Sequence, residues 1–112
     1  MNSKKEYPTG ATRSSNMAGV TEGSTREPRY DLISGIGLRR LAETYAEGAE
    51  IHGDRNWEQG LPINDCINRS LAHIFHYLGG DRSEDHLAHA AWGLFAAMHF
   101  EDKVKRGGDL GN

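Results

Sequence analysis

Glycines divide most of this 112-residue chain into short segments, and this division constrains its fold more than any other feature. Gly53 and Gly60 bracket a stretch without periodicity, Gly79-Gly80 follows an apolar run, and Gly107-Gly108 lies near the end. Glycine is common just after a helix because it adopts left-handed backbone conformations without steric cost. The segments between these breaks are as long as ordinary helices, so the spacing of their apolar residues decides the fold class.

Apolar residues recur at helical spacing in these segments. The first helix is predicted over residues 38–51, with an apolar face of Leu38, Leu41, Ala42, Tyr45 and Ala49. The second is predicted from Pro62 to about Leu78, with apolar residues Ile63, Ile67, Leu71, Ile74, Phe75 and Leu78. The third is predicted from Glu84, after Ser83 as N-cap, to about Lys105, with one face of Leu87, Ala91, Leu94 and Met98. The chain is therefore expected to be all-α, a small helical bundle.

A second stripe of the third helix carries small residues and histidines: His86, His89, Ala90, Gly93 and Ala97. Small side chains would let a neighbouring helix come close. Gly48 inside the first helix costs about 1 kcal/mol relative to alanine and also indicates a close approach. Helices of this size make a thin core, so a dimer or a docked N-terminal segment is expected to complete it.

Residues 1–28 are rich in Ser, Thr, Gly, Asn and charge and show no period. Such a segment buries too little surface to offset its ordering entropy, which predicts a flexible arm. An arm that becomes ordered against a partner or a ligand is the alternative. The helical domain is then expected over residues 29–106, followed by a tail at 107–112.

Composition excludes several classes of protein. The formal net charge of −3 argues against a general nucleic-acid binder, and the single cysteine, Cys66, allows no internal disulfide. The apolar stretch 90–100 is too short to span a bilayer, and the first residues lack the apolar core of a signal peptide. No membrane partner is expected, and the cytoplasm is the default location. The sequence also lacks a P-loop, a complete dinucleotide fingerprint and an HExxH zinc motif.

Histidines occur in two i, i+3 pairs, His73 with His76 and His86 with His89. Each pair shares a helical face, where imidazoles can bind a transition metal or, when protonated, donate to a phosphate. The alternative is that they are partly buried polar residues hydrogen-bonded across the bundle. The pattern leaves both open.

Glu43, Glu47 and Glu50 form a stripe opposite the apolar face of the first helix. Acidic residues in that position are usually just solvated. The alternative is a carboxylate cluster that binds Mg²⁺ or Mn²⁺ and neutralises a polyphosphate.

The loop Asp54-Arg55-Asn56-Trp57 combines a carboxylate, a guanidinium, an amide and an indole ring. Arginine can bind phosphate with two hydrogen bonds, tryptophan can stack on a base, and asparagine can bond to a base edge. A turn anchored by one buried tryptophan is the equal alternative. Trp92, at apolar spacing within a helix, is expected in the core.

These segments, taken in order, resemble the dATP/dGTP diphosphohydrolase N-terminal family of bacterial viruses. The resemblance runs from about Tyr7 to Glu101 and is carried by Thr9-Gly10-Ala11 with Arg13, Pro28-Arg29-Tyr30-Asp31-Leu32-Ile33, Gly48-Ala49, Gly53-Asp54-Arg55-Asn56-Trp57-Glu58, Gly60, His73 and His86-Leu87-Ala88-His89-Ala90-Ala91-Trp92.

This resemblance implies an all-α fold related to the nucleoside triphosphate pyrophosphohydrolases. It also implies Mg²⁺- or Mn²⁺-dependent cleavage of dGTP or dATP to the monophosphate and pyrophosphate, by a homo-oligomer (dimer or tetramer) in the cytoplasm, or in the host cytoplasm if the protein is viral. The wider superfamily binds metal through Glu-x-x-Glu and Glu-x-x-Asp pairs. Glu47 and Glu50 fit the first pair, whereas His86 and His89 stand where the second is expected, so another divalent transition metal is a further possibility.

The resulting hypothesis assigns metal binding to Glu43, Glu47, Glu50, Asp85, His86 and His89, catalysis to Glu47, Glu50 and His89, and substrate binding to Arg55, Asn56, Trp57 and His73. One rival hypothesis is a non-catalytic nucleotide- or metal-binding accessory or structural subunit of a virus. A second rival is an adaptor whose N-terminal arm folds onto a protein partner.

Overall fold

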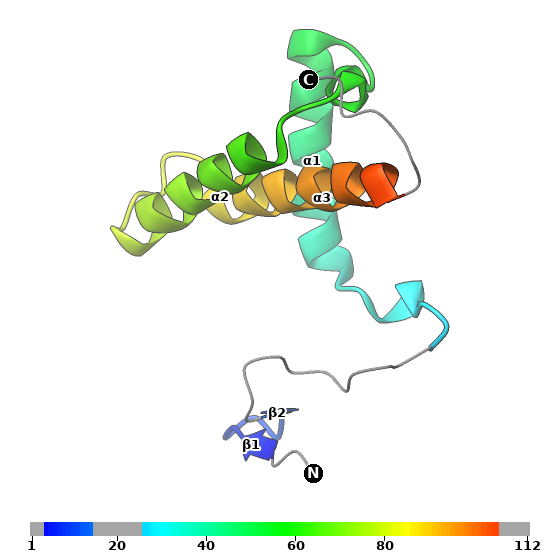
Figure 1. The fold of residues 1–112 in the computed structure, drawn as a ribbon. Coiled ribbons are helices and arrows are strands. Elements are labelled where there is room, and N and C mark those ends of the chain that lie inside the picture. The colour runs from blue at the N-terminus through cyan, green and yellow to red at the C-terminus, as the bar shows by residue number, and fades with distance from the viewer. Residues whose placement is uncertain (1–3, 15–25, 106–112) are drawn as a thin grey trace. The chain divides into compact units, whose positions relative to one another are not determined.

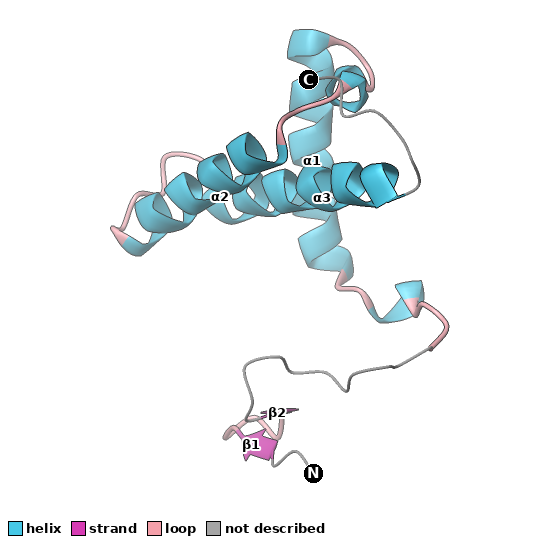
Figure 2. Ribbon diagram, in the orientation of Figure 1, coloured by secondary structure: helices cyan, strands magenta, loops and turns pink. Residues whose placement is uncertain are grey.

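The structure is a computed structural model that describes residues 4–14 and 26–105. The chain divides into two compact units, Met1–Asp31 and Leu32–Asn112. The larger unit contains the helices α1 (Gly35–His52), α2 (Ile63–Leu78) and α3 (His86–Lys105), and a short 3₁₀ helix, η2 (Asn56–Gln59), lies between α1 and α2. Figures 1 and 2 show that α2 and α3 run side by side while α1 crosses them. The expected all-α bundle is confirmed.

Local sequence signals set the helix ends. The Ser34 hydroxyl accepts a hydrogen bond from the Gly37 amide (3.0 Å) at the start of α1, and Gly53 ends that helix by donating to the Ala49 carbonyl (2.8 Å). α1 therefore begins at Gly35, three residues before the predicted Leu38. α2 ends at Leu78, directly before Gly79, as predicted.

The start of α3 differs from the prediction. The helix begins at His86, and the Asp85 carboxylate rather than the Ser83 hydroxyl caps it by accepting from the Ala88 amide (3.2 Å). Ser83 instead gives its backbone amide to the Asp81 carboxylate (2.9 Å). These bonds turn residues 81–85 into a short, locally bonded connection that precedes the helix.

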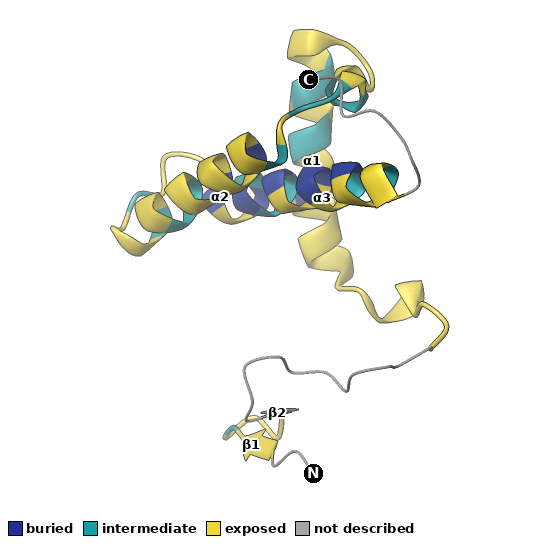
Figure 3. Ribbon diagram, viewed as in Figure 1, coloured by how far each residue is buried: buried dark blue, intermediate teal, exposed yellow. Residues whose placement is uncertain are grey.

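Small residues bring α2 and α3 together. The buried residues of α3 include Ala90, Gly93 and Ala97, as the small-residue stripe predicts. Buried Ser70 of α2 donates to the Ala90 carbonyl (2.8 Å). The core cluster consists of Cys66, Ala96, Ala97 and Phe100, with Trp57, Leu61, Ile63 and Trp92 packed against it. Figure 3 shows this buried side of α3 facing α2.

Several of the larger apolar side chains of α2 and α3 lie outside that core. Leu87, Leu94 and Met98, expected on the inner face of α3, are exposed, and so are the α2 residues Ile67, Leu71, Phe75 and Leu78. The prediction was wrong because α3 is apolar on several sides, and the close packing uses the side with the smallest residues. The close approach expected at Gly48 is also absent, because a Cβ there would meet no other atom within 4 Å among the described residues.

The N-terminal unit contains a β-hairpin within the segment predicted to be a flexible arm. β1 (Lys4–Glu6) pairs antiparallel with β2 (Thr12–Ser14), with Lys5 opposite Arg13. The turn is closed by hydrogen bonds between Tyr7 and residues 10 and 11, and Gly10 occupies the left-handed region at φ +89°. The strands are too short and too polar to show a period of two in the sequence. Residues 1–3 and 15–25 of the predicted arm, and the tail at 107–112, lie outside the described residues.

No helix among the described residues has both the length and the apolar character needed to cross a membrane.

Candidate active site

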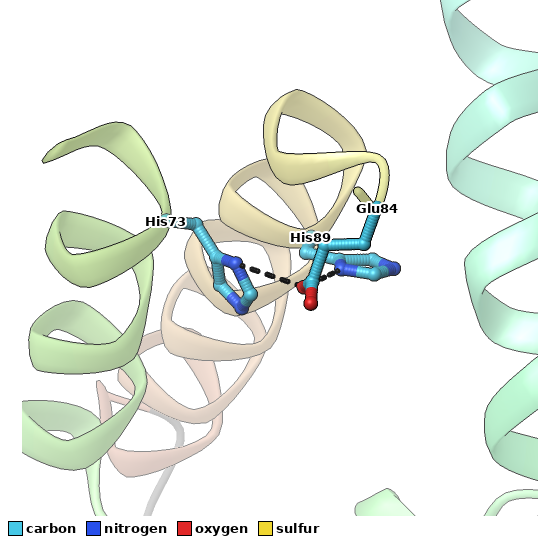
Figure 4. Close-up of side chains that lie close together, drawn as sticks. All are labelled: His73, Glu84 and His89. Atoms are coloured by element: carbon cyan, nitrogen blue, oxygen red, sulfur yellow. Dashed lines mark hydrogen bonds and ion pairs between the residues drawn. The ribbon is translucent and has the colours of Figure 1, made fainter. Parts of the chain in front are cut away.

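Three polar side chains from α2, α3 and the connection between them converge at one point (Figure 4). The Glu84 carboxylate lies 2.9 Å from His89 Nδ1 and 3.4 Å from His73 Nδ1. One ligand atom from each of the three residues lies within 4.8 Å of the other two. This arrangement joins the two histidine pairs of the sequence through a carboxylate that the sequence hypothesis did not include.

His86 is the buried residue of this cluster and bonds to two of its neighbours. Its side chain is 3% exposed, its Nε2 lies 2.9 Å from the Asp81 carboxylate, and its Nδ1 lies 2.9 Å from His73 Nδ1. The carboxylate can only accept, so Nε2 carries the proton, and the Nδ1 of a neutral His86 then accepts from His73. His76 stacks on the same ring at a centroid distance of 5.4 Å. His86 therefore orients His73 from a buried position.

The protonation states favour this network at neutral pH. Burial lowers the pKa of His73, with a further contribution from the neighbouring histidines, so this imidazole is neutral. The hydrogen bond from His89 lowers the pKa of Glu84, and bonds from the Ser83 amide and His86 lower that of Asp81. The cluster thus combines ionised carboxylates with an imidazole whose nitrogen lone pair is free of a proton.

A pocket of about 930 Å³ lies beside the cluster. Its walls come from α1, the 53–62 connection, α2 and α3, and they include Glu47, His73 and His89. All of the predicted substrate-binding residues, Arg55, Asn56, Trp57 and His73, line it, as do Asp65 and Arg69. The fold therefore brings the predicted nucleotide loop and part of the histidine cluster to the same cavity.

The loop residues have local partners as well. Arg55, in the left-handed region at φ +58°, donates to the Glu58 carboxylate (2.7 Å), and Asn56 accepts from the Gln59 amide (3.1 Å). The Trp57 ring packs edge-on against Phe100 at 6.0 Å. Trp57 is both the anchor of its turn and part of the pocket wall, so the two interpretations of this loop are compatible.

The predicted acidic residues separate in the structure. Glu47 lies at the pocket, with Oε2 at 3.7 Å from His89 Nε2. Glu43 forms an exposed ion pair with Arg39 (3.4 Å), and Glu50 is not among the residues that line the pocket. The stripe is therefore mostly a solvated face, as its alternative interpretation expected, with Glu47 as the member that reaches the site.

Asp85 has a different set of contacts from those of a metal ligand. It receives two hydrogen bonds from the Arg40 guanidinium, one of them 2.9 Å long, in addition to capping α3. The Arg40 bonds lower the pKa of Asp85 to about 2. Its carboxylate joins α1 to the start of α3, which is a structural contact.

Sequence reasoning missed Glu84 and Asp81. In the sequence, Glu84 only marks the predicted start of the third helix, and no pattern singles out Asp81. The available signal was the group of carboxylates at 81, 84 and 85 directly before the second histidine pair. Only the packing of α2 against α3 shows that Glu84 also meets His73.

The fold and the pocket define a small helical protein with a cavity lined by acidic, basic and aromatic side chains. The chain belongs to the dATP/dGTP diphosphohydrolase, N-terminal, family, whose sequence model matches residues 17–109. Searches of curated proteins and of solved structures gave no significant match.

Proposed function

We propose that this protein hydrolyses a purine deoxynucleoside triphosphate, dGTP or dATP, to the monophosphate and pyrophosphate with the help of a divalent cation. The observation that carries the proposal is the shared cavity. Glu47, His73 and His89 reach it from the helices, and the loop Arg55–Trp57 forms another part of its wall. Membership of the dATP/dGTP diphosphohydrolase N-terminal family supports the same substrate class.

The nucleotide would be bound by residues with complementary chemistry. Arg55 and Arg69 supply guanidinium groups for the phosphates, and the Trp57 ring offers a surface for the base. The pocket volume of about 930 Å³ lies in the upper part of the range of ligand sites, which is enough for a nucleotide. Arg55 would exchange its exposed contact with Glu58 for a phosphate oxygen.

The chemical step is attack of a water oxygen on the α-phosphorus and cleavage of the bond to the oxygen that leaves with pyrophosphate. Glu47, close to His89, is the candidate base that accepts the proton of the attacking water. A cation such as Mg²⁺ or Mn²⁺, when bound, would neutralise phosphate charge and activate the water. The carboxylates and imidazoles at the cavity fit a divalent cation by their donor chemistry.

A second copy of the chain is the proposed partner of the exposed apolar stripe Ile67, Leu71, Phe75 and Leu78 on α2. The core of one chain is built mainly from small residues, and few large side chains are buried in the part described here. Burying each of these side chains in an interface would contribute about 1.5–3 kcal/mol before the cost of association. A homo-oligomer would therefore supply the core that one chain lacks.

Product analysis tests the proposed reaction. Purified protein is incubated with each common ribo- and deoxyribonucleoside triphosphate and Mg²⁺ or Mn²⁺, and the products are separated by chromatography. We expect pyrophosphate and a monophosphate, formed fastest from a deoxypurine substrate.

Glu47→Gln should abolish the reaction, whereas Glu43→Gln, on the same helix but in an exposed ion pair, should leave it unchanged. Absence of hydrolysis by folded wild-type protein with either metal would contradict the proposal. Nucleotide binding without turnover would instead support the accessory-subunit alternative.

A further inference from the structure

The nitrogens around Glu84 are spaced like the ligands of one metal ion. For metal–ligand bonds of about 2.1 Å, donors at angles between 90° and 109° lie about 3.0–3.4 Å apart. His89 Nδ1 and His73 Nδ1 lie 2.9 and 3.4 Å from the same oxygen of Glu84. Small side-chain movements would therefore place all of these donors in a common coordination sphere.

The residue types favour a particular class of metal. Two imidazoles and one carboxylate are the donors of transition-metal sites, whereas Mg²⁺ prefers an octahedron of oxygens and keeps several waters. The set supplies one carboxylate oxygen and two imidazole nitrogens.

Side chains next to the three proposed ligands also fit a metal site. When His73 and His89 bind a metal through Nδ1, the proton of each ring moves to Nε2, and the hydrogen bond from His73 to His86 is given up. His89 Nε2 already lies 3.7 Å from the Glu47 carboxylate. Carboxylates behind metal-bound histidines commonly fix the tautomer in this way. His86 Nδ1 lies 3.7 Å from the same Glu84 oxygen, and Asp81 holds the proton of that ring on Nε2. Imidazole nitrogens of three histidines therefore surround one carboxylate oxygen.

We propose that His73, Glu84 and His89 form a site for a first-row transition-metal ion, with His86–Asp81 and Glu47 as the groups that orient the ligands, and that this site binds such an ion in preference to Mg²⁺. A role of this metal in catalysis rests on the proposed function, whereas the binding of the metal by the protein does not.

The test measures metal binding without nucleotide. Metal-free full-length protein is titrated with Co²⁺ while its visible absorption is recorded, and Zn²⁺ or Mg²⁺ is then added as a competitor. We expect one equivalent of Co²⁺ per chain, displaced by Zn²⁺ and retained in a tenfold molar excess of Mg²⁺.

Glu84→Gln and His89→Gln should each weaken Co²⁺ binding by about tenfold or more. Both side chains are partly exposed, and circular dichroism checks that the variants remain helical. Glu101→Gln and His52→Gln are matched controls outside the cluster and should bind like the wild type.

Failure of the wild type to bind Co²⁺ or Zn²⁺, or binding that survives both ligand substitutions, would overturn the inference. The two proposals can fail separately. Tight Co²⁺ binding without hydrolysis of any nucleotide removes the proposed function and leaves the metal site. Mg²⁺-dependent hydrolysis that persists in His89→Gln, with no Co²⁺ binding by the wild type, removes the metal site and leaves the function.

Discussion

The hydroxyl oxygen of Ser70 on α2 lies 2.1 Å from the position that a Cβ at Gly93 on α3 would occupy. The Cys66 carbonyl lies 2.8 Å from the same point, so backbone as well as side chain fills the space. Ser70 itself is held there by its bond to the Ala90 carbonyl. The absence of a side chain at residue 93 thus allows the close packing of α2 and α3 that positions His73 beside His89.

Gly93→Ala should separate these helices. We expect a loss of about 1–3 kcal/mol in the free energy of unfolding, because an added methyl group must push Ser70 and the α2 backbone away. Urea unfolding followed by circular dichroism measures this change. Gly48→Ala is the matched control, since it meets open space within a helix and should stabilise the protein by about 0.5–1 kcal/mol. A stabilised Gly93→Ala variant would contradict the packing described for this pair.

Asp85→Ala should reduce stability without affecting the metal site. The variant removes the cap of α3 and the contact with Arg40, and the lost cap alone costs about 1 kcal/mol. Arg40→Ala should cost less, because its side chain is half exposed and its ion pair is screened by solvent. Thermal unfolding and Co²⁺ titration of the same samples check both expectations. Weaker Co²⁺ binding by a stably folded Asp85→Ala variant would assign Asp85 to the metal site instead.

Asp81 should make stability depend on acid pH. The bonds from the Ser83 amide and His86 give this carboxylate a lower pKa in the folded state than in the unfolded state. Its contribution is therefore complete above the unfolded value of about 4, and it is lost as the pH falls toward the folded value.

Urea unfolding of metal-free protein between about pH 6 and pH 3 measures this effect. The difference in stability between the wild type and Asp81→Asn should shrink as the pH is lowered, because asparagine does not titrate. The exposed Asp54→Asn variant is the control. A difference that grows toward acid pH would have the wrong sign for this explanation.

Phe75→Glu should dissociate the proposed homo-oligomer. The Phe75 side chain is 69% exposed in the single chain, so a charge there costs little in the monomer and much in an apolar interface. Light scattering after size-exclusion chromatography gives the molar mass of both proteins. Ile36→Glu is the control. Its side chain is 80% exposed on α1, outside the α2 stripe, so this variant should leave the molar mass unchanged. A wild type that is monomeric at all concentrations would remove the second copy as the partner of this stripe.

The sequence predicted the helices well because glycines, proline and helical periodicity all mark the same boundaries. The small-residue stripe predicted the close contact of α3 with α2, but the face of large apolar residues is not buried with it: Leu94 is exposed, whereas Ala97 is buried. Hydrophobic periodicity locates the apolar faces of a helix. Which of these faces packs closest against a second helix depends on side-chain size.

The site was predictable in part. Arg55, Asn56 and Trp57 were recognised by their types in one loop, and they line the pocket. Glu84 was missed because its contact with His73 joins residues on different elements, and no spacing rule within one helix reports such a contact. Glu47 and Glu43 are adjacent on one helical stripe, and only the position of α3 distinguishes them.

The connection between α2 and α3 supplies three carboxylates with different partners: Asp81 bonds to His86 and Glu84 to His89, both on α3, and Asp85 bonds to Arg40 on α1. The loop therefore supplies carboxylates of the site, whereas the helices supply its histidines. A change in the length or composition of residues 79–85 would remove the charges around the histidines while leaving the contact of Ser70 with α3 in place. Within such a scaffold, metal selectivity would diverge through this one short loop, at a cost in stability wherever Asp81 or Asp85 is replaced.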